Sequence, residues 1–315
     1  MKIAVLNGEP WQMDFLKNIS DTELITAQNT EMLFAQKANA FIIFNITSCE
    51  WLDPAEQIPS YLQIDEVDLN VRPGEGSASH AINTVWVYVD GTANGVYELP
   101  AKVPLLYEGK HELIIMPGIK LNGITTTRAV YPFYDNYVTQ VTFVPDSITK
   151  VKPVFNYMDG INFHFIEDFE TAGTIFNSSP TSDTTIITTD NDDDVFEGVF
   201  SGIISLTDTE DSVFIYTINS YSLDPGFMHF LELNYKSTEH LTIGVNVYTN
   251  TGPLTYPYIV LKPTSEWKKI YINLTPLATR YGATSSFIIY FSSEKTSNNV
   301  EGKILLDNIK LISSQ

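Results

Sequence analysis

The sequence has very little cysteine and little positive charge. Cys49 is the single cysteine among 315 residues, so the chain can form neither an internal disulfide framework nor a CxxC metal site. Only 18 Lys and Arg residues stand against 38 Asp and Glu residues, which gives a formal net charge of -20. A chain this acidic repels phosphate backbones, so we expect no nucleic-acid partner.

Long apolar runs and helix-favouring charged runs are also scarce. No stretch approaches the roughly 18 to 20 apolar residues that a membrane-spanning helix needs. By contrast, Tyr (17), Phe (18), Gly (17) and Pro (16) are abundant. This composition predicts a mainly β fold made of many short strands joined by turns.

Motifs for enzyme chemistry are missing as well. The sequence contains no GxSxG elbow and no HExxH motif, and no GxGxxG follows the first apolar run. Acid pairs such as Glu167–Asp168 are expected by chance among 38 acids, and a glycosidase needs two carboxyls facing each other across a cleft. We therefore expect that the protein is not an enzyme. The alternative is an enzyme, and a hydrolase is the only class that we consider for it. None of the five histidines has a nucleophile motif beside it: His80, His111, His164, His229 and His240.

The first 48 residues allow two interpretations. "MKIAVLNG", "EPWQMDFLKNIS" and "ELITA" are typical of a strand, a short helix and a second strand, and together they indicate a small α/β fragment. Alternatively, an export signal begins at Met32, with Lys37 as its charge and "AFIIFNI" as its apolar region.

The second interpretation depends on Cys49. Ile46-Thr47-Ser48-Cys49 has the aliphatic, small, small, cysteine order of a bacterial lipidation box, although Asn39 and Asn45 interrupt the apolar region. We expect Cys49 to carry lipid and residues 49–57 to form a tether. The alternative is an ordered N-terminal segment in which Cys49 is a buried small residue.

Residues 58–150 predict an antiparallel β-sandwich of Ig-like type. "TVWVYVDG" alternates with period two, and Asp90-Gly91 and Asn94-Gly95 are hairpin-turn signals. The run from "VYVDG" to "EGKHELII" resembles PEGA-like surface modules. The matching residues are Val89, Asp90, Gly91, Pro104, Gly109 and His111.

Residues 151–163 are expected to be a linker, and residues 164–315 a jelly-roll β-sandwich. At least eight strand patterns follow one another, among them "HFLELNYKS", "LTIGVNVYTN" and "EWKKIYINLT", with no helix of any length. "IEDFE", "VFEGVFSGIISL", "EWKKIYINLTPL" and "GKILLDNIKLI" occur in an order that resembles carbohydrate-binding modules with a galactose-binding-like jelly roll.

That resemblance implies a structural Ca²⁺ that ties the first strand of the jelly roll to the last. Hard cations prefer several oxygen ligands, and the acids at matching positions are Glu167 or Glu170 and Asp307. The other acidic run, Asp190–Asp194, lacks EF-hand spacing, and we interpret it as a solvated loop.

Carbohydrate is the ligand that the resemblance implies. Sugar rings stack on aromatic side chains, and this makes Tyr256, Tyr258 and Trp267 the candidate contacts. Tyr256 and Tyr258 are expected in a loop, where functional residues concentrate. For each of these residues the competing interpretation is a place in a sandwich core.

The stretch from "CEWLDPAEQIPSYLQIDEVDL" through "YPFY" is similar to mature Bacteroidota-type outer-membrane lipoproteins. This resemblance implies a non-enzymatic, lipid-anchored protein of the outer membrane or cell surface that binds a ligand, carbohydrate being the favoured class. The alternative is a structural or accessory subunit of an outer-membrane complex, with a protein as its partner.

Overall fold

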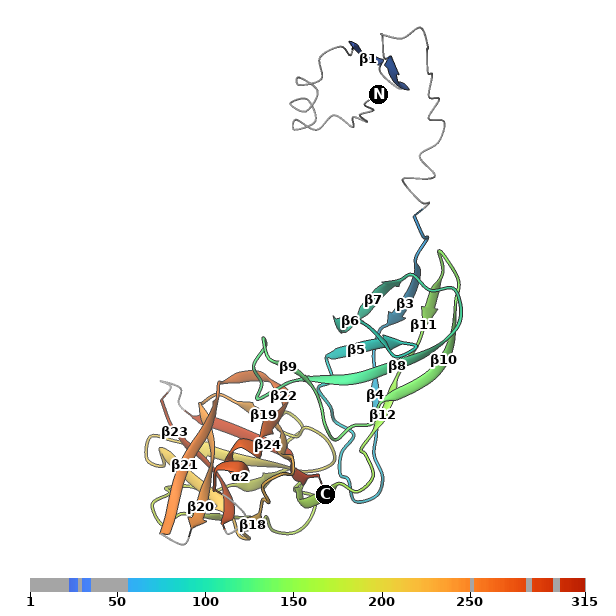
Figure 1. Cartoon of the computed structure of the whole chain (residues 1–315). Coiled ribbons are helices and arrows are strands. Elements are labelled where there is room, and N and C mark those ends of the chain that lie inside the picture. Colours follow the sequence, from blue (N-terminus) through green and yellow to red (C-terminus); the bar gives the residue numbers. More distant parts are fainter. Residues whose placement is uncertain are drawn as a thin grey trace. The chain divides into compact units, whose positions relative to one another are not determined.

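A computed structural model describes residues 23–27, 30–34, 56–249, 252–281, 285–296 and 301–314. The chain divides into two compact units, residues 1–58 and 59–315. Figure 1 shows the strands of the second unit, coloured from blue-green to red along the sequence.

In the first unit, the described residues form one antiparallel hairpin of β1 (Glu23–Ala27) and β2 (Thr30–Phe34). This confirms the strand expected at "ELITA". Met32, the suggested internal start, lies in β2. Cys49 and the other elements expected before residue 49 lie outside the described residues.

The second unit begins with a β-sandwich whose apolar residues alternate along its strands. In β5, Val85, Val87 and Val89 are fully buried, whereas Trp86 and Tyr88 are half-buried. One sheet has the order β10-β8-β5-β6, with β9 beside β8, and it faces the sheet β11-β3-β7 across a shared core. The strands are β3 (Ser60–Ile64), β4 (Asp68–Asn70), β5 (Thr84–Val89), β6 (Thr92–Glu98), β7 (Ala101–Leu105), β8 (Gly109–Lys120), β9 (Arg128–Val130), β10 (Tyr137–Phe143), β11 (Ile148–Lys150) and β12 (Val154–Asn156).

The two sequences of this sandwich that were expected to form hairpin turns adopt different structures. Asp90-Gly91 forms the tight turn between β5 and β6, with φ of 48° and 75°. Asn94-Gly95 was expected as a hairpin turn, and this is wrong: both residues lie within β6 at a bulge opposite β5. A bulge satisfies the same preference for positive φ at Gly95 as a turn does.

Residues 151–163, expected to be a linker, contain strand β12, which pairs with β4 in a parallel sense. β11 likewise pairs in parallel with β3. Both pairs depart from the all-antiparallel arrangement that the sequence indicated.

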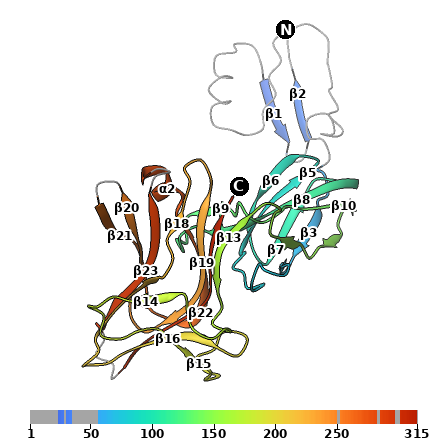
Figure 2. The ribbon, with the colours of Figure 1, turned by 90° about the horizontal axis from the view of Figure 1, so that it is seen from below.

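The second sandwich is a jelly roll of two six-stranded sheets (Figures 1 and 2), as expected from its strand patterns. One sheet has the order β15-β16-β24-β19-β22, with β13 beside β24. The other has the order β14-β17-β23-β20-β21, with β18 beside β23. The elements are β13 (Asn162–Glu167), β14 (Phe176–Ser178), β15 (Ile187–Thr189), β16 (Ser201–Leu206), β17 (Ser212–Thr217), β18 (Tyr221–Ser222), β19 (His229–Ser237), β20 (Leu241–Thr249), β21 (Gly252–Leu261), β22 (Thr264–Asn273), α2 (Thr275–Tyr281), β23 (Ser286–Glu294) and β24 (Gly302–Ser313).

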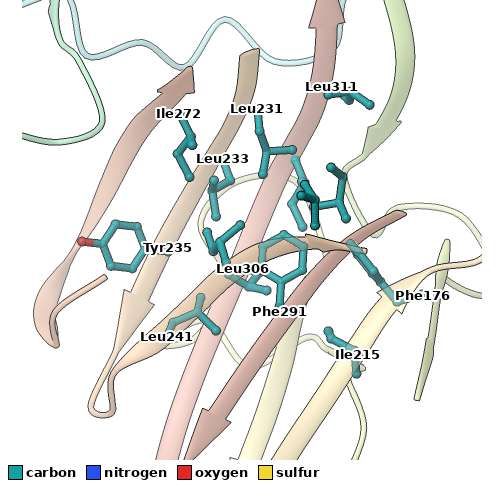
Figure 3. Close-up of a cluster of buried hydrophobic side chains, with 14 of the residues drawn as sticks. Phe176, Ile215, Leu231, Leu233, Tyr235, Leu241, Ile272, Phe291, Leu306 and Leu311 are labelled. Carbon is teal, nitrogen blue, oxygen red and sulfur yellow. The ribbon is translucent and has the colours of Figure 1, made fainter. Parts of the chain in front are cut away.

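The core of the jelly roll lies between these two sheets. Figure 3 shows Leu231, Leu233 and Leu306 from one sheet against Ile215 and Phe291 from the other. All five side chains are fully buried. Burying a Leu, Ile or Phe side chain contributes about 1.5–3 kcal/mol each, so this cluster holds the two sheets together.

One short helix corrects the expectation of a jelly roll without helix. α2 spans seven residues, and it buries Leu277 and Ala278 against the core. Among the described residues, no helix has the length and hydrophobicity to cross a membrane.

Candidate functional site

The two sandwiches of residues 59–315 meet at a buried carboxylate, Glu232 in β19. Tyr131 and Tyr157 of the first sandwich donate to it: the Tyr131 hydroxyl lies 2.6 Å from Oε1, and the Tyr157 hydroxyl lies 3.0 Å from each oxygen. Nζ of Lys269 in β22 forms an ion pair with Oε2 at 2.9 Å. Lys310 in β24 stands beside Glu232 in the strand register.

Burial and charge together set the pKa values at this junction. Burial alone would raise the pKa of Glu232, but the positive charges of Lys269 and Lys310 hold that pKa below its usual value. Burial and the charge of Lys269 lower the pKa of Lys310 to about 8. Burial and the nearby Glu232 carboxylate raise the pKa values of Tyr131 and Tyr157 well above 10. The tyrosines therefore stay neutral donors to an ionised glutamate.

Further hydrogen bonds fix the first sandwich on the second. The Ala81 amide donates to the Tyr271 hydroxyl at 2.9 Å, and the Asn122 amide donates to the Tyr271 carbonyl oxygen at 2.9 Å. The Asn234 side-chain amide donates to the Ser79 hydroxyl at 3.0 Å. The surfaces beside these contacts are therefore held in one arrangement before any ligand binds.

A turn at Asn122-Gly123 brings the backbone of the first sandwich into contact with β22 of the jelly roll. Both residues have positive φ, 54° and 69°. A Cβ on Gly123 would lie 2.9 Å from Cδ1 of Ile270, so only glycine allows this approach without a shift.

Beside this turn, a groove of about 930 Å³ separates the two sandwiches. The first sandwich contributes side chains from residues 79–83 and 120–125. The jelly roll contributes Phe196, Asn234, Tyr235 and residues from 259–262 and 267–271. The volume lies at the upper end of the range of about 300–1,000 Å³ that small-molecule sites occupy.

Trp267, one of the residues selected from the sequence, lies in this groove. It shares a face of β22 with Lys269 and Tyr271, because alternate residues of a strand point the same way. Its ring lies 5.2 Å from the ring of Phe196 at an interplanar angle of 55°. Asn83, Asn122 and Asn234 also line the groove. Aromatic surface and amide groups therefore face the same space.

Tyr256 and Tyr258, the other two aromatic candidates, lie in strand β21 and not in the expected loop. Both rings are half-buried against the jelly-roll core. The Tyr258 hydroxyl donates to the Asn273 carbonyl oxygen at 2.7 Å, and the Arg280 guanidinium lies 5.7 Å from the centre of the Tyr256 ring. The structure does not bring these two residues together with Trp267 in the groove.

The three candidate calcium ligands are each engaged by hydrogen-bond donors. Glu167 accepts from the amides of Phe169 and Ile175, at 3.0 and 2.8 Å. Glu170 accepts from two backbone amides of residues 199–200, at 2.7 and 2.9 Å. Asp307 accepts from the hydroxyl of Ser201 at 2.5 Å.

Burial, together with the nearby carboxylates of Glu197 and Asp168, raises the pKa of Asp307 to about 7. Within the described part of the chain, no three His, Cys, Asp or Glu side chains are grouped as a metal site. The residues present do not fit a ready-made calcium site, and calcium stays a prediction to be tested.

A smaller cavity of about 260 Å³ contains two histidines that share one hydroxyl. Ser313 Oγ lies 2.5 Å from Nδ1 of His229 and 2.7 Å from Nε2 of His164. The other nitrogen of His229 lies 2.9 Å from the backbone carbonyl oxygen of Asp224. Among the described residues, a backbone carbonyl and not a carboxylate holds this second nitrogen of His229.

Aromatic side chains also lie on the outer face of the sheet that contains β20 and β23, where Tyr290 is buried and Phe214 is half-buried. The rings of Phe214 and Tyr290 stack at 4.7 Å with an interplanar angle of 17°. Tyr248 in β20 is 46% exposed, and the buried Oδ1 of Asn246 has no hydrogen-bond partner among the described residues. Tyr248 stands close to a turn in the sequence, and that position is a signal for a ligand contact, whereas Phe214 and Tyr290 show only ordinary strand alternation.

No protein-family model and no curated protein sequence matches the chain. Several solved structures of carbohydrate-binding modules are similar to part of it. A family 61 module in complex with β-1,4-galactotriose has 13% identity and a TM-score of 0.29, and the match covers 43% of this chain and 85% of that one. For a xylan-binding family 22 domain the identity is 7%, the TM-score 0.34 and the coverage 47% and 93%. A family 11 module of a Clostridium thermocellum cellulosomal cellulase has 18% identity, a TM-score of 0.31 and coverage of 48% and 94%.

Proposed function

We propose that this chain is a non-enzymatic cell-envelope lipoprotein that binds carbohydrate in the groove between its two sandwiches. The observation that carries the proposal is the position of Trp267. It is the one aromatic candidate from the sequence that lines a preformed groove, and amide side chains line the same groove.

The chemistry of the groove suits a saccharide. The apolar faces of sugar rings pack on aromatic rings, and hydroxyl groups need donors and acceptors at the sides. Trp267 and Phe196 supply the rings, and Asn83, Asn122 and Asn234 belong to the polar lining. Hydrogen bonds across the junction keep the groove preformed, so binding a sugar orders few additional groups.

The envelope location is supported by sequence alone. The Ile46-Thr47-Ser48-Cys49 box and the two β-sandwiches that follow are what a tethered surface protein needs. Mass spectrometry of the chain purified from membranes is the test. A triacylated Cys49 at the mature N-terminus is expected, whereas a chain that starts at Met1 with an unmodified thiol contradicts the anchor.

A protein-docking role is the second candidate, and exposed apolar side chains on the first sandwich favour it. Val96 in β6 is 48% exposed and Val138 in β10 is 55% exposed, each on an outermost strand of the same sheet. Unpaired edges with apolar side chains are places where another chain can pair. A stoichiometric protein partner that co-purifies from native membranes would support this role.

Saccharide binding is tested with a glycan array, followed by calorimetry on the strongest hit. Replacing Trp267 by alanine should weaken binding about tenfold or more, because a buried aromatic contact contributes on the order of 1–3 kcal/mol. Tyr248→Ala is the matched control, since it removes an exposed aromatic ring from the other sheet. Melting curves of both variants separate lost binding from lost folding.

Two results would contradict the proposal. An array without any hit removes carbohydrate as the ligand. A loss of binding in Tyr248→Ala, with Trp267→Ala unchanged, moves the site from the groove to the outer face of the other sheet.

A further inference from the structure

The groove has a charge opposite to that of the chain as a whole. Its lining includes Lys120, Lys262, Lys268 and Lys269 but no Asp or Glu. The complete sequence has 38 acidic and only 18 basic residues. Four basic side chains and no acidic one are therefore concentrated around one space.

The floor of the groove contains a buried lysine. The Lys269 side chain is only 2% exposed, and Glu232 is its ion-pair partner among the described residues. Glu232 also stands beside a second buried cation, Lys310, whose charge Glu197 and Glu75 stabilise as well. Nζ of Lys269 has no partner in hydrogen-bond geometry among the described residues, although it lines the groove.

The rim adds cations that point to solvent. Lys262 and Lys268 are exposed, and Lys120 is half-exposed. Within the described residues, no hydrogen bond or ion pair engages these three ammonium groups. A ligand can therefore approach them without first breaking a contact within the protein.

We infer that the ligand of the groove is an acidic saccharide, one that carries carboxylate or sulfate groups on sugar rings packed against Trp267. This inference rests on the proposed function and gives its ligand class. Aromatic surface recognises the ring, the asparagines recognise hydroxyls, and the lysines recognise the acid groups. A neutral saccharide would leave the ammonium groups of Lys120, Lys262 and Lys268 without counterions beside the groove.

The negative charge of the protein as a whole favours a short ligand. At a net charge of -20 the protein as a whole repels polyanions, whereas the groove presents lysines. We therefore expect short acidic segments or chain ends to bind better than long polyanions.

The test is calorimetry of the full chain with matched oligosaccharides of equal length. One arm uses an oligogalacturonate, its methyl ester and the neutral oligogalactoside, and a second arm uses a sulfated oligogalactoside. EDTA is present throughout, so that no divalent cation bridges ligand and protein. We expect an acid form to bind about tenfold or more tightly than its neutral counterpart, and its affinity to fall as salt rises from 20 to 200 mM.

Lysine variants test whether the preference for the acidic ligand comes from the groove. Lys262→Gln with Lys268→Gln should weaken binding of the acidic ligand about tenfold and change binding of the neutral one less than about twofold. Lys110→Gln, an exposed lysine in β8 that does not line the groove, is the control and should change neither. The better of the carboxylate and sulfate arms identifies the acid group.

Each remaining outcome is decisive. Equal, salt-independent affinity for neutral and acidic forms overturns the acidic ligand but keeps the proposed function. If Lys110→Gln loses as much affinity as the double variant, the groove lysines are not the source of the charge selectivity. No binding to any saccharide in either arm overturns both proposals.

Discussion

Replacing Glu232 by glutamine removes the carboxylate that joins the two sandwiches. The glutamine has nearly the same shape, so packing changes little, but Lys269 is left buried without its ion-pair partner and Lys310 loses a neighbouring anion. Removing one partner of a buried ion pair typically costs about 3–5 kcal/mol, because the remaining charge stays desolvated. For a unit of this size, each kcal/mol lowers the melting temperature by about 2–4 °C, so we expect a fall of about 10 °C.

Thermal melting followed by calorimetry measures this change, and two further variants interpret it. Glu266→Gln changes an exposed acid next to Trp267, and it should leave the stability within about 0.5 kcal/mol of wild type. Lys269→Met in the Glu232→Gln background removes one uncompensated charge and should recover part of the loss. A Glu232→Gln protein that melts like wild type would refute the argument that this ion pair fixes the groove.

Three other changes test further parts of the structure. Burial lowers the pKa values of His164 and His229 below 6.5, so the stability that the neutral histidines contribute is complete above about pH 6.5 and is lost as the pH falls below it. Glutamine at both positions should therefore make the free energy of unfolding, measured in urea, depend less on pH. An unchanged pH dependence would contradict this explanation. Gly244→Ala should lower the free energy of unfolding by about 1–3 kcal/mol, because the new Cβ would lie 2.4 Å from the Tyr290 ring and 2.5 Å from the Tyr256 carbonyl oxygen. A variant that melts at the wild-type temperature would contradict this prediction. Added calcium should raise the melting temperature and EDTA should lower it if the acids near Asp307 bind the ion, and identical curves would remove the site.

The strands of the jelly roll were predictable because burial on one face imposes a period of two. "HFLELNYKS" was expected as a strand, and it is β19 residue for residue. Turn chemistry was less decisive. Asp90-Gly91 and Asn94-Gly95 both favour positive φ, but a turn and a bulge share that preference, so only the pairing with β5 distinguishes them.

Short parallel pairs were not predictable. β12 is three residues long, and its partner β4 lies about 85 residues earlier in the chain, so no local pattern marks it. Pro145 and Pro153 before it indicated a linker, and the pairing with β4 that orders the segment lies far away in the sequence.

The candidate site was predictable only in part. Trp267 was identified because it stands in a strand pattern with a jelly-roll resemblance, and it does line the groove. The opposite wall comes from residues 79–83 and 120–125, more than 130 residues away, and no sequence spacing predicts that meeting. The one local signal was Lys268-Lys269 directly after Trp267, a pair of cations in a chain that has few.

A crystal structure of the full chain with the acidic oligosaccharide that binds best in calorimetry tests the proposed binding site most directly. We expect a sugar ring packed on Trp267 and an acid group within ion-pair distance of Lys262, Lys268 or Lys269. A sugar bound beside Tyr248 on the other sheet, with the groove empty, would contradict it.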